Sequence, residues 1–530
     1  MKQTIISLSL TLFTFGLSNT LYGQENKDIL NWYNGKGPGM ETEKAYKMLN
    51  KRKTSSVIVA VIDSGIDIEH EDLKGKIWTN SDEIPGNNID DDKNGYVDDV
   101  HGWNFLGNAK GENLNEACLE KTRILRTLSL KFEGIDPANL SDKEKEDYTL
   151  FEKVKAEVEE EKSMYESYLG QMDMVSMMMD QVPAIVGNAL GKTDYTIKDL
   201  QKWNPEDEQM MQLKDFAVAM KTGELTKDVI EDQKRSIEEM VNFNLNLEYD
   251  DRILIGDNPE DFNDKSYGNP DVEGPDALHG THVGGIIGAV RGNGLGGDGV
   301  AENVLLMAVR AVPAGDENDK DIALAVRYAV DNGAKVINMS FGKSYSPHQK
   351  EVYEAFKYAD SKGVLLVHAA GNDNADVDTN PNFPTSLYSF QSQPLDHFLT
   401  IGASTKISKK QLAASFSNYG QTKVDVFAPG FEIYNSVPQS AYKKLQGTSM
   451  AAPMVAGVAA MLKSYFSALS MKEIKDIMLQ SAKSYKGTLQ HKPGSEELVD
   501  FSTLSTTGGV VNVKRAAKMC LALEKSKTSK

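Results

Sequence analysis

The sequence predicts an α/β fold with a central parallel sheet, helices on both faces of the sheet, and a large, mainly helical insertion. Short runs of apolar, mostly β-branched residues alternate with helical patterns along most of the 530 residues. This alternation is typical of parallel strands joined by crossover helices. Residues 106–250 depart from it, because charged residues and methionine become frequent there and β-branched residues become scarce. An apolar fraction of 40% provides enough side chains for a large core.

The acidic composition argues against two classes of binding partner. The formal net charge is −19 and the sequence pI is about 5.0. Nucleic acids and anionic membrane surfaces bind basic patches, so neither is expected as the main partner. The two cysteines, Cys118 and Cys520, either form a disulfide or remain free thiols.

Residues 1–23 have the features of a secretory signal peptide. Lys2 supplies the positive charge, residues 5–17 form a short apolar run, and residues 21–23 precede the expected cleavage site. The alternative is a buried N-terminal helix. No later segment is long and apolar enough to span a bilayer. The mature chain is therefore expected to have no transmembrane segment and to be periplasmic or extracellular.

A polar lead-in, residues 24–44, precedes the first α/β segment, residues 45–105, and a short helix is expected over Glu41–Leu49. Residues 57–62 are apolar and mostly β-branched, which predicts a buried parallel strand that ends at Asp63. Functional groups in open α/β sheets collect at the carboxyl ends of strands, so Asp63 is a candidate site residue. The alternative is an aspartate that only forms a turn.

An acidic, turn-rich stretch over residues 87–104 resembles a calcium-binding loop, with Gly95 at its sharp turn. The alternating ligand spacing of such a loop is met by Asp90, Asp92, Asn94, the Tyr96 carbonyl and Asp98. His101 stands where an EF-hand has its bidentate glutamate, and no helix-loop-helix pattern surrounds the stretch. The sequence predicts a structural calcium ion here, and the alternative is a solvated acidic turn.

The insertion, residues 106–250, is predicted to be helical. Ser141 and Glu144 form a capping box at the start of a helix. Apolar residues recur at helical spacing over 148–158 and again over 169–179, and a third helix is expected over 229–245. The methionines of this block are interpreted as flexible core residues.

The α/β pattern resumes in residues 251–520, and a short polar tail follows at 521–530. A helix rich in small residues is expected to begin at His279. Further strands are expected over 304–309, 335–339 and 364–367, and further helices over 322–332 and 352–362. Ser449 directly precedes a run of small and apolar residues that ends at Leu462 and predicts a buried helix, with Pro453 in its first turn.

Asp63, His279 and Ser449 supply the three groups that nucleophilic catalysis by serine requires. A serine hydroxyl is a weak nucleophile, so it needs a base, and the base needs an acid that orients it. For Ser449 alone, the alternative is a helix N-cap. The segments Asp63-Ser64-Gly65, His279-Gly280-Thr281-His282 and Gly447-Thr448-Ser449-Met450-Ala451-Ala452-Pro453 resemble the three motifs of the subtilisin-like serine peptidases (subtilases, peptidase family S8), in that family's order.

The resemblance implies a subtilisin-like three-layer fold and an exported serine endopeptidase that forms an acyl-enzyme intermediate. Ser449 would be the nucleophile, His279 the general base and then acid, and Asp63 its orienting partner, which are the roles of the three residues in other peptidases of this family. Asn372 and the Ser449 backbone N–H match the oxyanion hole. No cofactor is needed for this chemistry, and protein or peptide substrates are the expected partners.

The resemblance also implies a substrate-binding strand. The residues that match it and the walls of the primary specificity pocket are Ser340, Phe341, Gly342, Ala369, Ala370 and Gly371. Their apolar, uncharged character suggests a broad or apolar preference at the residue before the cleaved bond. His282 lies one turn from His279, but no third metal ligand accompanies this pair, so His282 is interpreted as structural.

Two competing functions and two departures from the family pattern follow. A non-catalytic binding or scaffold protein could use the same fold, whereas an α/β-hydrolase esterase would require Gly-x-Ser-x-Gly and the order Ser, acid, His. The insertion separates the Asp63 and His279 motifs, and the lead-in is too short for a folded propeptide. We therefore expect the insertion to cap or restrict the cleft or to mediate assembly; the alternative is a peripheral decoration.

Overall fold

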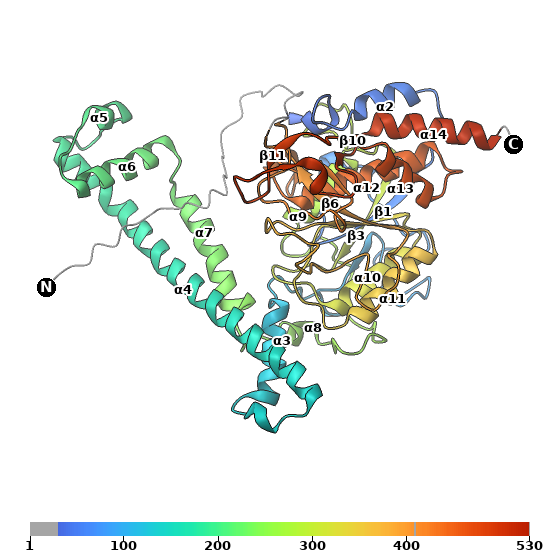
Figure 1. Ribbon diagram of the computed structural model, residues 1–530, viewed down its shortest axis with the longest axis horizontal. Coiled ribbons are helices and arrows are strands. Elements are labelled where there is room, and N and C mark those ends of the chain that lie inside the picture. The colour runs from blue at the N-terminus through green and yellow to red at the C-terminus, as the bar shows by residue number, and fades with distance from the viewer. Residues whose placement is uncertain (1–29, 408–409, 529–530) are drawn as a thin grey trace. The chain divides into compact units, whose positions relative to one another are not determined.

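A computed structural model describes residues 30–407 and 410–528 (Figure 1). The signal-peptide prediction, residues 1–23, lies outside the described residues. The chain divides into two compact units, one comprising Lys155–Leu245 and the other Asn26–Val154 with Asn246–Lys530. The helix α4 (Asp142–Leu190) contains the boundary between them. Each unit has a hydrophobic core of its own.

The larger unit is built on one nine-stranded sheet with the order β10-β13-β7-β6-β5-β4-β1-β3-β2. All neighbouring strands are parallel except β10 and β13, which are antiparallel. The strands are β1 Val57–Asp63, β2 Gly102–Asn104, β3 Val304–Arg310, β4 Val336–Met339, β5 Leu365–Ala369, β6 Phe398–Ser404, β7 Val426–Pro429, β10 Lys483–Ser484 and β13 Gly509–Val510. The predicted parallel sheet is thereby confirmed.

Helices cover both faces of this sheet, because the side chains of each strand alternate between two cores. In β1, Val59 and Val61 belong to the core shared with α9 (Leu278–Gly288) and α12 (Thr448–Tyr465). Ala60 and Ile62 belong to the core shared with α10 (Asp319–Asp331) and α11 (Gln349–Ser361). Figure 1 shows these helix pairs on either side of the strands, as the sequence predicted.

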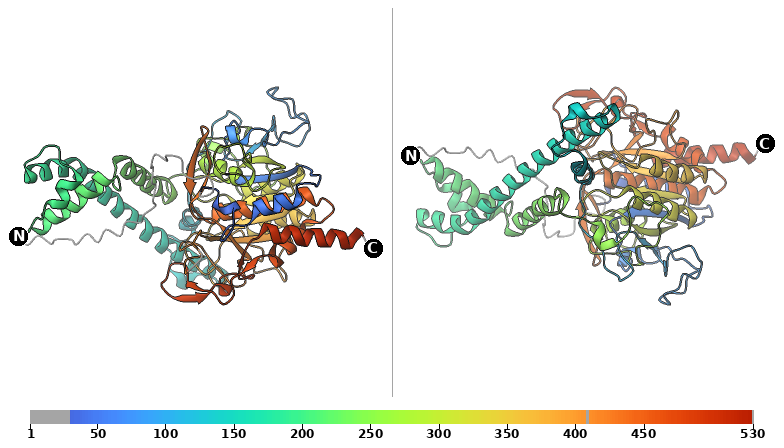
Figure 2. Two further views of the ribbon diagram at one scale, coloured as in Figure 1. Left: turned by 90° about the horizontal axis from the view of Figure 1, so that it is seen from above. Right: turned by 90° about the horizontal axis from the view of Figure 1, so that it is seen from below.

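Segments near the two ends of the described chain pack together beside this core. Helix α2 (Thr42–Leu49) contacts α14 (Val513–Thr528), and α13 (Met471–Gln480) packs between α14 and α12, as Figures 1 and 2 show for α2 and α14. Two hairpins complete the unit: β8 (Ile433–Val437) with β9 (Ala441–Leu445), and β11 (Leu489–His491) with β12 (Leu498–Asp500). Cys118 and Cys520 are both buried free thiols.

The insertion is helical, as predicted, but its helices differ from the expected ones. The capping box is present, since Ser141 N–H donates to Glu144 and Glu144 N–H donates to Ser141 Oγ. The two helices expected over 148–158 and 169–179 are one helix, α4, because the intervening residues are strong helix formers and Gly170 alone does not end it. The other helices of residues 106–250 are α3 Glu120–Phe132, the short η3 Pro137–Asn139, α5 Ile197–Lys202, α6 Glu208–Thr222, α7 Lys227–Glu239 and the π-helical η4 Met240–Asn244. The short helix α8 Arg252–Ile255 follows the insertion.

The sequence pattern did not identify α5 and α6. In the smaller unit these helices pack against the second half of α4 through Leu200 and Ala217, which join Val182 and Val186 in one apolar cluster. Among the described residues, no helix combines the length and the apolar character that crossing a membrane requires.

Candidate active site

The predicted site residues gather at the carboxyl edge of the sheet. Strands β1, β4 and β5 are adjacent and parallel, so their last residues lie at the same edge. Asp63 ends β1, Ser340 follows β4, and Ala370 follows β5. Helix α12 packs on these strands and begins beside Ser449. The topology thus collects groups that are far apart in the sequence.

His279 is oriented by Asp63. The His279 Nδ1 lies 2.6 Å from Asp63 Oδ1, and the same oxygen accepts a hydrogen bond from the Ser64 N–H at 2.8 Å. Asp63 is 1% exposed, whereas the His279 side chain is 36% exposed. A carboxylate accepts, so Nδ1 carries the proton and Nε2 presents its lone pair on the other side of the ring. This is the tautomer that a general base requires.

The backbones of the Asp63 and His279 motifs are in direct contact. A Cβ atom on Gly280 would lie 2.1 Å from the Gly65 carbonyl oxygen. Only glycine allows this approach, which brings the first turn of α9 against the end of β1. Gly280, directly after His279, therefore allows the short distance between the His279 and Asp63 side chains.

Opposing effects act on the charge of His279. Burial alone would lower the pKa of its imidazole, but the negative charge of Asp63, the hydrogen bond that Nδ1 donates to Asp63 and the charge of Asp276 together raise the pKa above its ordinary value of 6.5. The protonated ring is thus stabilised, as a proton acceptor in catalysis requires.

Ser449 lies in the first turn of α12 and exchanges hydrogen bonds with Ser340. The Ser449 hydroxyl donates to the Ser340 carbonyl at 3.2 Å, and the Ser340 hydroxyl donates to the Ser449 carbonyl at 2.9 Å. Asn338 donates to the Ser340 hydroxyl at 2.9 Å and fixes its direction. Among the hydrogen bonds of the described residues, none joins Ser449 to His279. The Ser449 hydroxyl is instead engaged with the Ser340 carbonyl.

Asn372 is held with its amide nitrogen free to donate. Its Oδ1 accepts from the Thr448 N–H at 2.8 Å and from the Thr448 hydroxyl at 3.0 Å. A backbone N–H can only donate, so this contact identifies the oxygen of the Asn372 amide and leaves Nδ2 on the opposite side. Asn372 is solvent-exposed. The sequence did not identify Thr448 as the residue that orients Asn372, although its position next to Ser449 could have indicated a role in the site.

The side chains of the predicted substrate-binding segments diverge. Phe341 packs into the core on the α10 and α11 face, Ala369 into the core on the α9 and α12 face, and Ala370 into a third cluster with Val377. These segments therefore expose mainly their backbone, and not the side chains of Phe341, Ala369 and Ala370, at the sheet edge.

Asn382 is a further residue at this wall. A Cβ atom on Gly342 would lie 3.0 Å from Asn382 Oδ1, and Asn382 Nδ2 donates to the Ala370 carbonyl at 2.9 Å. Asn382 lies in residues 380–386, to which the sequence assigned no role although they resemble a family loop beside the pocket. Asn382 thus places a polar side chain beside Gly342 and Ala370, two of the predicted pocket residues that were interpreted as apolar.

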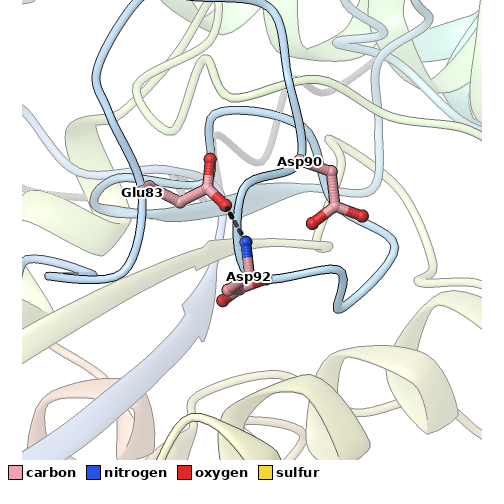
Figure 3. A group of neighbouring side chains, drawn as sticks. All are labelled: Glu83, Asp90 and Asp92. Atoms are coloured by element: carbon pink, nitrogen blue, oxygen red, sulfur yellow. Dashed lines mark hydrogen bonds between the residues drawn. The ribbon is translucent and has the colours of Figure 1, made fainter.

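The remaining candidates have surroundings of their own. His282 is fully buried, its Nε2 lies 3.0 Å from the Ile433 carbonyl, and burial lowers its pKa to about 3, so the ring is neutral. Of the predicted calcium ligands, Asp90 and Asp92 lie together with Glu83 (Figure 3). The Asp98 carboxylate instead accepts hydrogen bonds from backbone N–H groups of residues 86–88.

Comparisons with known proteins identify the family of this chain. The sequence model of the subtilase family matches residues 54–502. The chain belongs to the subtilase family. The thermophilic serine proteinase of Bacillus sp. strain AK1 is 38% identical over 229 residues, which cover 43% of this chain and 51% of that protein. Thermitase of Thermoactinomyces vulgaris is 37% identical over 211 residues, which cover 40% of this chain and 69% of that protein.

The shared region is limited in extent. This subtilase spans about half the length of the Bacillus relative. Among solved structures, the proteases from Pseudoalteromonas arctica align with a TM-score of 0.39 and 28% identity, over 49% of this chain and 80% of that chain.

Proposed function

We propose that this subtilase is a serine endopeptidase that hydrolyses peptide bonds through an acyl-enzyme intermediate. The observation that carries the proposal is the 2.6 Å hydrogen bond between His279 Nδ1 and Asp63, at the sheet edge where α12 begins with Thr448 and Ser449. Membership of the family and the serine proteinases among the relatives support it. The catalytic roles of the three residues are part of the proposal.

The first half-reaction begins when the Ser449 hydroxyl turns from the Ser340 carbonyl to His279 Nε2. Ser449 Oγ attacks the substrate carbonyl carbon while His279 takes the hydroxyl proton. The negative oxygen that develops is stabilised by Asn372 Nδ2 and the Ser449 backbone N–H. His279 then gives its proton to the leaving amine, and the C–N bond breaks. Water repeats the sequence on the acyl-enzyme, and the serine is restored.

The substrate is proposed to bind as an extended strand along residues 340–342. Main-chain hydrogen bonds to such a segment would hold many sequences, which supports a broad or apolar preference. The Ser340 carbonyl, which accepts from Ser449 at 3.2 Å, is one acceptor that a substrate N–H could take over. Protein and peptide substrates are thus the proposed partners, and no cofactor takes part in the bond-breaking steps.

Labelling with a serine-directed phosphonate tests this function. Wild type is expected to be labelled and to degrade casein, and Ser449→Ala is expected to do neither. Labelling of both proteins would place the nucleophile elsewhere. If wild type is neither labelled nor active on any protein substrate, the chain is better explained as a non-catalytic binding protein on a peptidase fold.

Export is proposed from the character of residues 1–23 and from the relatives, of which one is a cell wall-associated protease of Bacillus subtilis. Mass spectrometry of the N-terminus of protein recovered outside the cytoplasm is expected to find the chain beginning after about residue 23. Recovery of the intact N-terminus from the cytoplasm alone would contradict export.

A further inference from the structure

The acidic loop before β2 contains a buried carboxylate, Glu83, one oxygen of which has no hydrogen-bond partner among the described residues. Glu83 is 6% exposed, and its Oε2 is buried without a hydrogen-bond donor among the described residues. Its Oε1 accepts from the N–H groups of Asp91 and Asp92 at 2.9 and 3.2 Å. An unpaired buried carboxylate oxygen is costly, because the charge has lost its water and gained nothing in return.

Two further carboxylates surround the same space. One oxygen each of Glu83, Asp90 and Asp92 lies within 4.8 Å of the other two, and Figure 3 shows Glu83 extending toward the two aspartates. Oxygens bound to one calcium ion at about 2.4 Å can be up to about 5 Å apart. Three like charges at this separation repel one another unless a cation lies between them.

The loop has the local geometry of an EF-hand-like site up to its seventh position. Asp90 accepts from the N–H groups of Asn94 and Gly95 at 3.1 and 2.9 Å, which folds the loop tightly around its first ligand. No backbone N–H of the described residues donates to the Tyr96 carbonyl, so this oxygen is available. The twelfth position is His101, whose Nδ1 lies 2.8 Å from the Trp78 carbonyl and is thereby engaged elsewhere.

We propose that Glu83 supplies the carboxylate that the twelfth position lacks, and that Glu83, Asp90 and Asp92, with Asn94 and the Tyr96 carbonyl, bind one calcium ion. The closing ligand thus comes from the chain before the loop instead of after it. Asp98, which the sequence pattern included, is not a ligand in this proposal. Its Oδ1 accepts from Gly86 N–H and its Oδ2 from Asn88 N–H, both at 2.8 Å, so it supports the turn that follows Glu83.

Calcium binding to this loop would also stabilise the edge of the main sheet. Tyr96 packs edge-on against Tyr328 of α10 at a ring separation of 4.9 Å, and the Tyr328 hydroxyl donates to Asp99 at 2.6 Å. These contacts connect the loop to the core on the α10 face. An ion held by the loop would therefore stabilise the neighbouring edge strand β2 and the folded state as a whole.

The test uses the full chain in a Ser449→Ala background, which prevents self-digestion, after removal of bound metal with EDTA. Calcium is titrated by calorimetry into this protein and into versions carrying Glu83→Gln, Asp90→Asn or Asp82→Asn. Asp82 is the matched control, because it is exposed and adjacent to Glu83. We expect the number of calcium ions bound per chain to fall by one with Glu83→Gln and with Asp90→Asn, and not with Asp82→Asn. An equal number in all four proteins would overturn the proposal, and so would an equal loss with Asp82→Asn.

Thermal unfolding separates metal binding from an ordinary structural role. Glutamine preserves the oxygen that accepts from Asp91 and Asp92 and removes one of the repelling charges. Glu83→Gln is therefore expected to match or exceed its parent in Tm in EDTA, and to fall several degrees below it in millimolar calcium. The same loss of Tm in both conditions would show that Glu83 acts through hydrogen bonds alone and would overturn the proposal.

Discussion

Helices α12 and α4 show how differently one secondary structure is used in the two regions of this chain. In α12, every residue from Met450 to Leu462 is buried, and small residues allow close packing; a Cβ atom on Gly457 would lie 2.7 Å from Val300. Helix α4 has 49 residues, but the large apolar ones that are buried are confined to Phe151, Val154, Val158, Met179, Val182 and Val186. Met174 and Met177 are more than half exposed.

The difference between α12 and α4 indicates which of the two helices matters more for stability and for catalysis. A helix that is apolar all round belongs to a core, and its first turn is held rigidly enough to present a nucleophile. A long helix with a narrow apolar stripe contributes less per residue and tolerates change. We therefore expect substitutions in α12 and at its first turn to alter activity or stability strongly, and those on the exposed side of α4 to be nearly silent. The following predictions test this expectation, from the largest effect to the smallest.

Ser449→Ala should lower kcat/KM at least about 10⁴-fold, because no other group would attack the substrate carbonyl. Its Tm should stay close to that of wild type. Ser464→Ala is the matched control, since Ser464 is buried in the same helix and donates to the Met461 carbonyl. Comparable loss of activity in both variants would mean that α12, and not the Ser449 hydroxyl, is what activity requires.

Asn372→Ala should lower kcat about 10²–10³-fold with little change in KM, because one oxyanion donor is lost only in the transition state. Thr448→Val keeps the backbone donor to Asn372 but loses the hydroxyl, so a smaller decrease in kcat is expected. Steady-state kinetics on a peptide substrate measures both. A rise in KM at constant kcat would instead assign Asn372 to substrate binding.

Leu462→Ala should lower the free energy of unfolding by about 2–5 kcal/mol, because Leu462 is fully buried and its removal leaves a cavity. Met177→Ala, on the exposed side of α4, should change it by no more than about 0.5 kcal/mol. Denaturant unfolding of the inactive Ser449→Ala protein gives both values. Similar losses at the two positions would contradict the contrast between the helices.

Replacing Lys155–Leu245 with a short Gly/Ser linker tests the expected role of the insertion. If the insertion restricts access, the rate of casein cleavage should rise several-fold relative to that of a short peptide. Mass photometry of the same two proteins reports any loss of assembly. Unchanged rates for both substrates together with an unchanged mass would leave the insertion as a peripheral decoration.

The pH profile should show a small, directional effect of Asp276. His279 must be neutral to accept a proton, and its pKa is raised above 6.5, so kcat/KM should fall as the pH drops through a midpoint above 6.5. Asp276 contributes to that rise. Asp276→Asn should therefore move the acid limb to lower pH, and by more at low ionic strength than at high ionic strength. No movement, or movement to higher pH, would contradict this account of His279.

Local patterns predicted much of the structure because they report on short-range physics. Residues 57–62 are apolar on both sides and became the doubly buried strand β1, and the run after Ser449 became the buried α12. The separation of the insertion's first two expected helices, 148–158 and 169–179, was wrong, because strong helix formers fill the residues between them and α4 continues through both. The helices α5 and α6 were missed because their apolar residues do not recur clearly at helical spacing, and because they are stabilised by packing on α4.

By itself, the sequence determined the fold class, the family and the identity of the three triad candidates, since each depends on short motifs and on their order. Only the tertiary structure decided that Thr448 orients Asn372, that Ser449 donates to Ser340, and that Glu83 rather than Asp98 faces Asp90 and Asp92. These facts depend on the direction in which side chains point across turns and between strands. Directions of that kind follow from packing around the whole core, and residue spacing along the chain does not encode them.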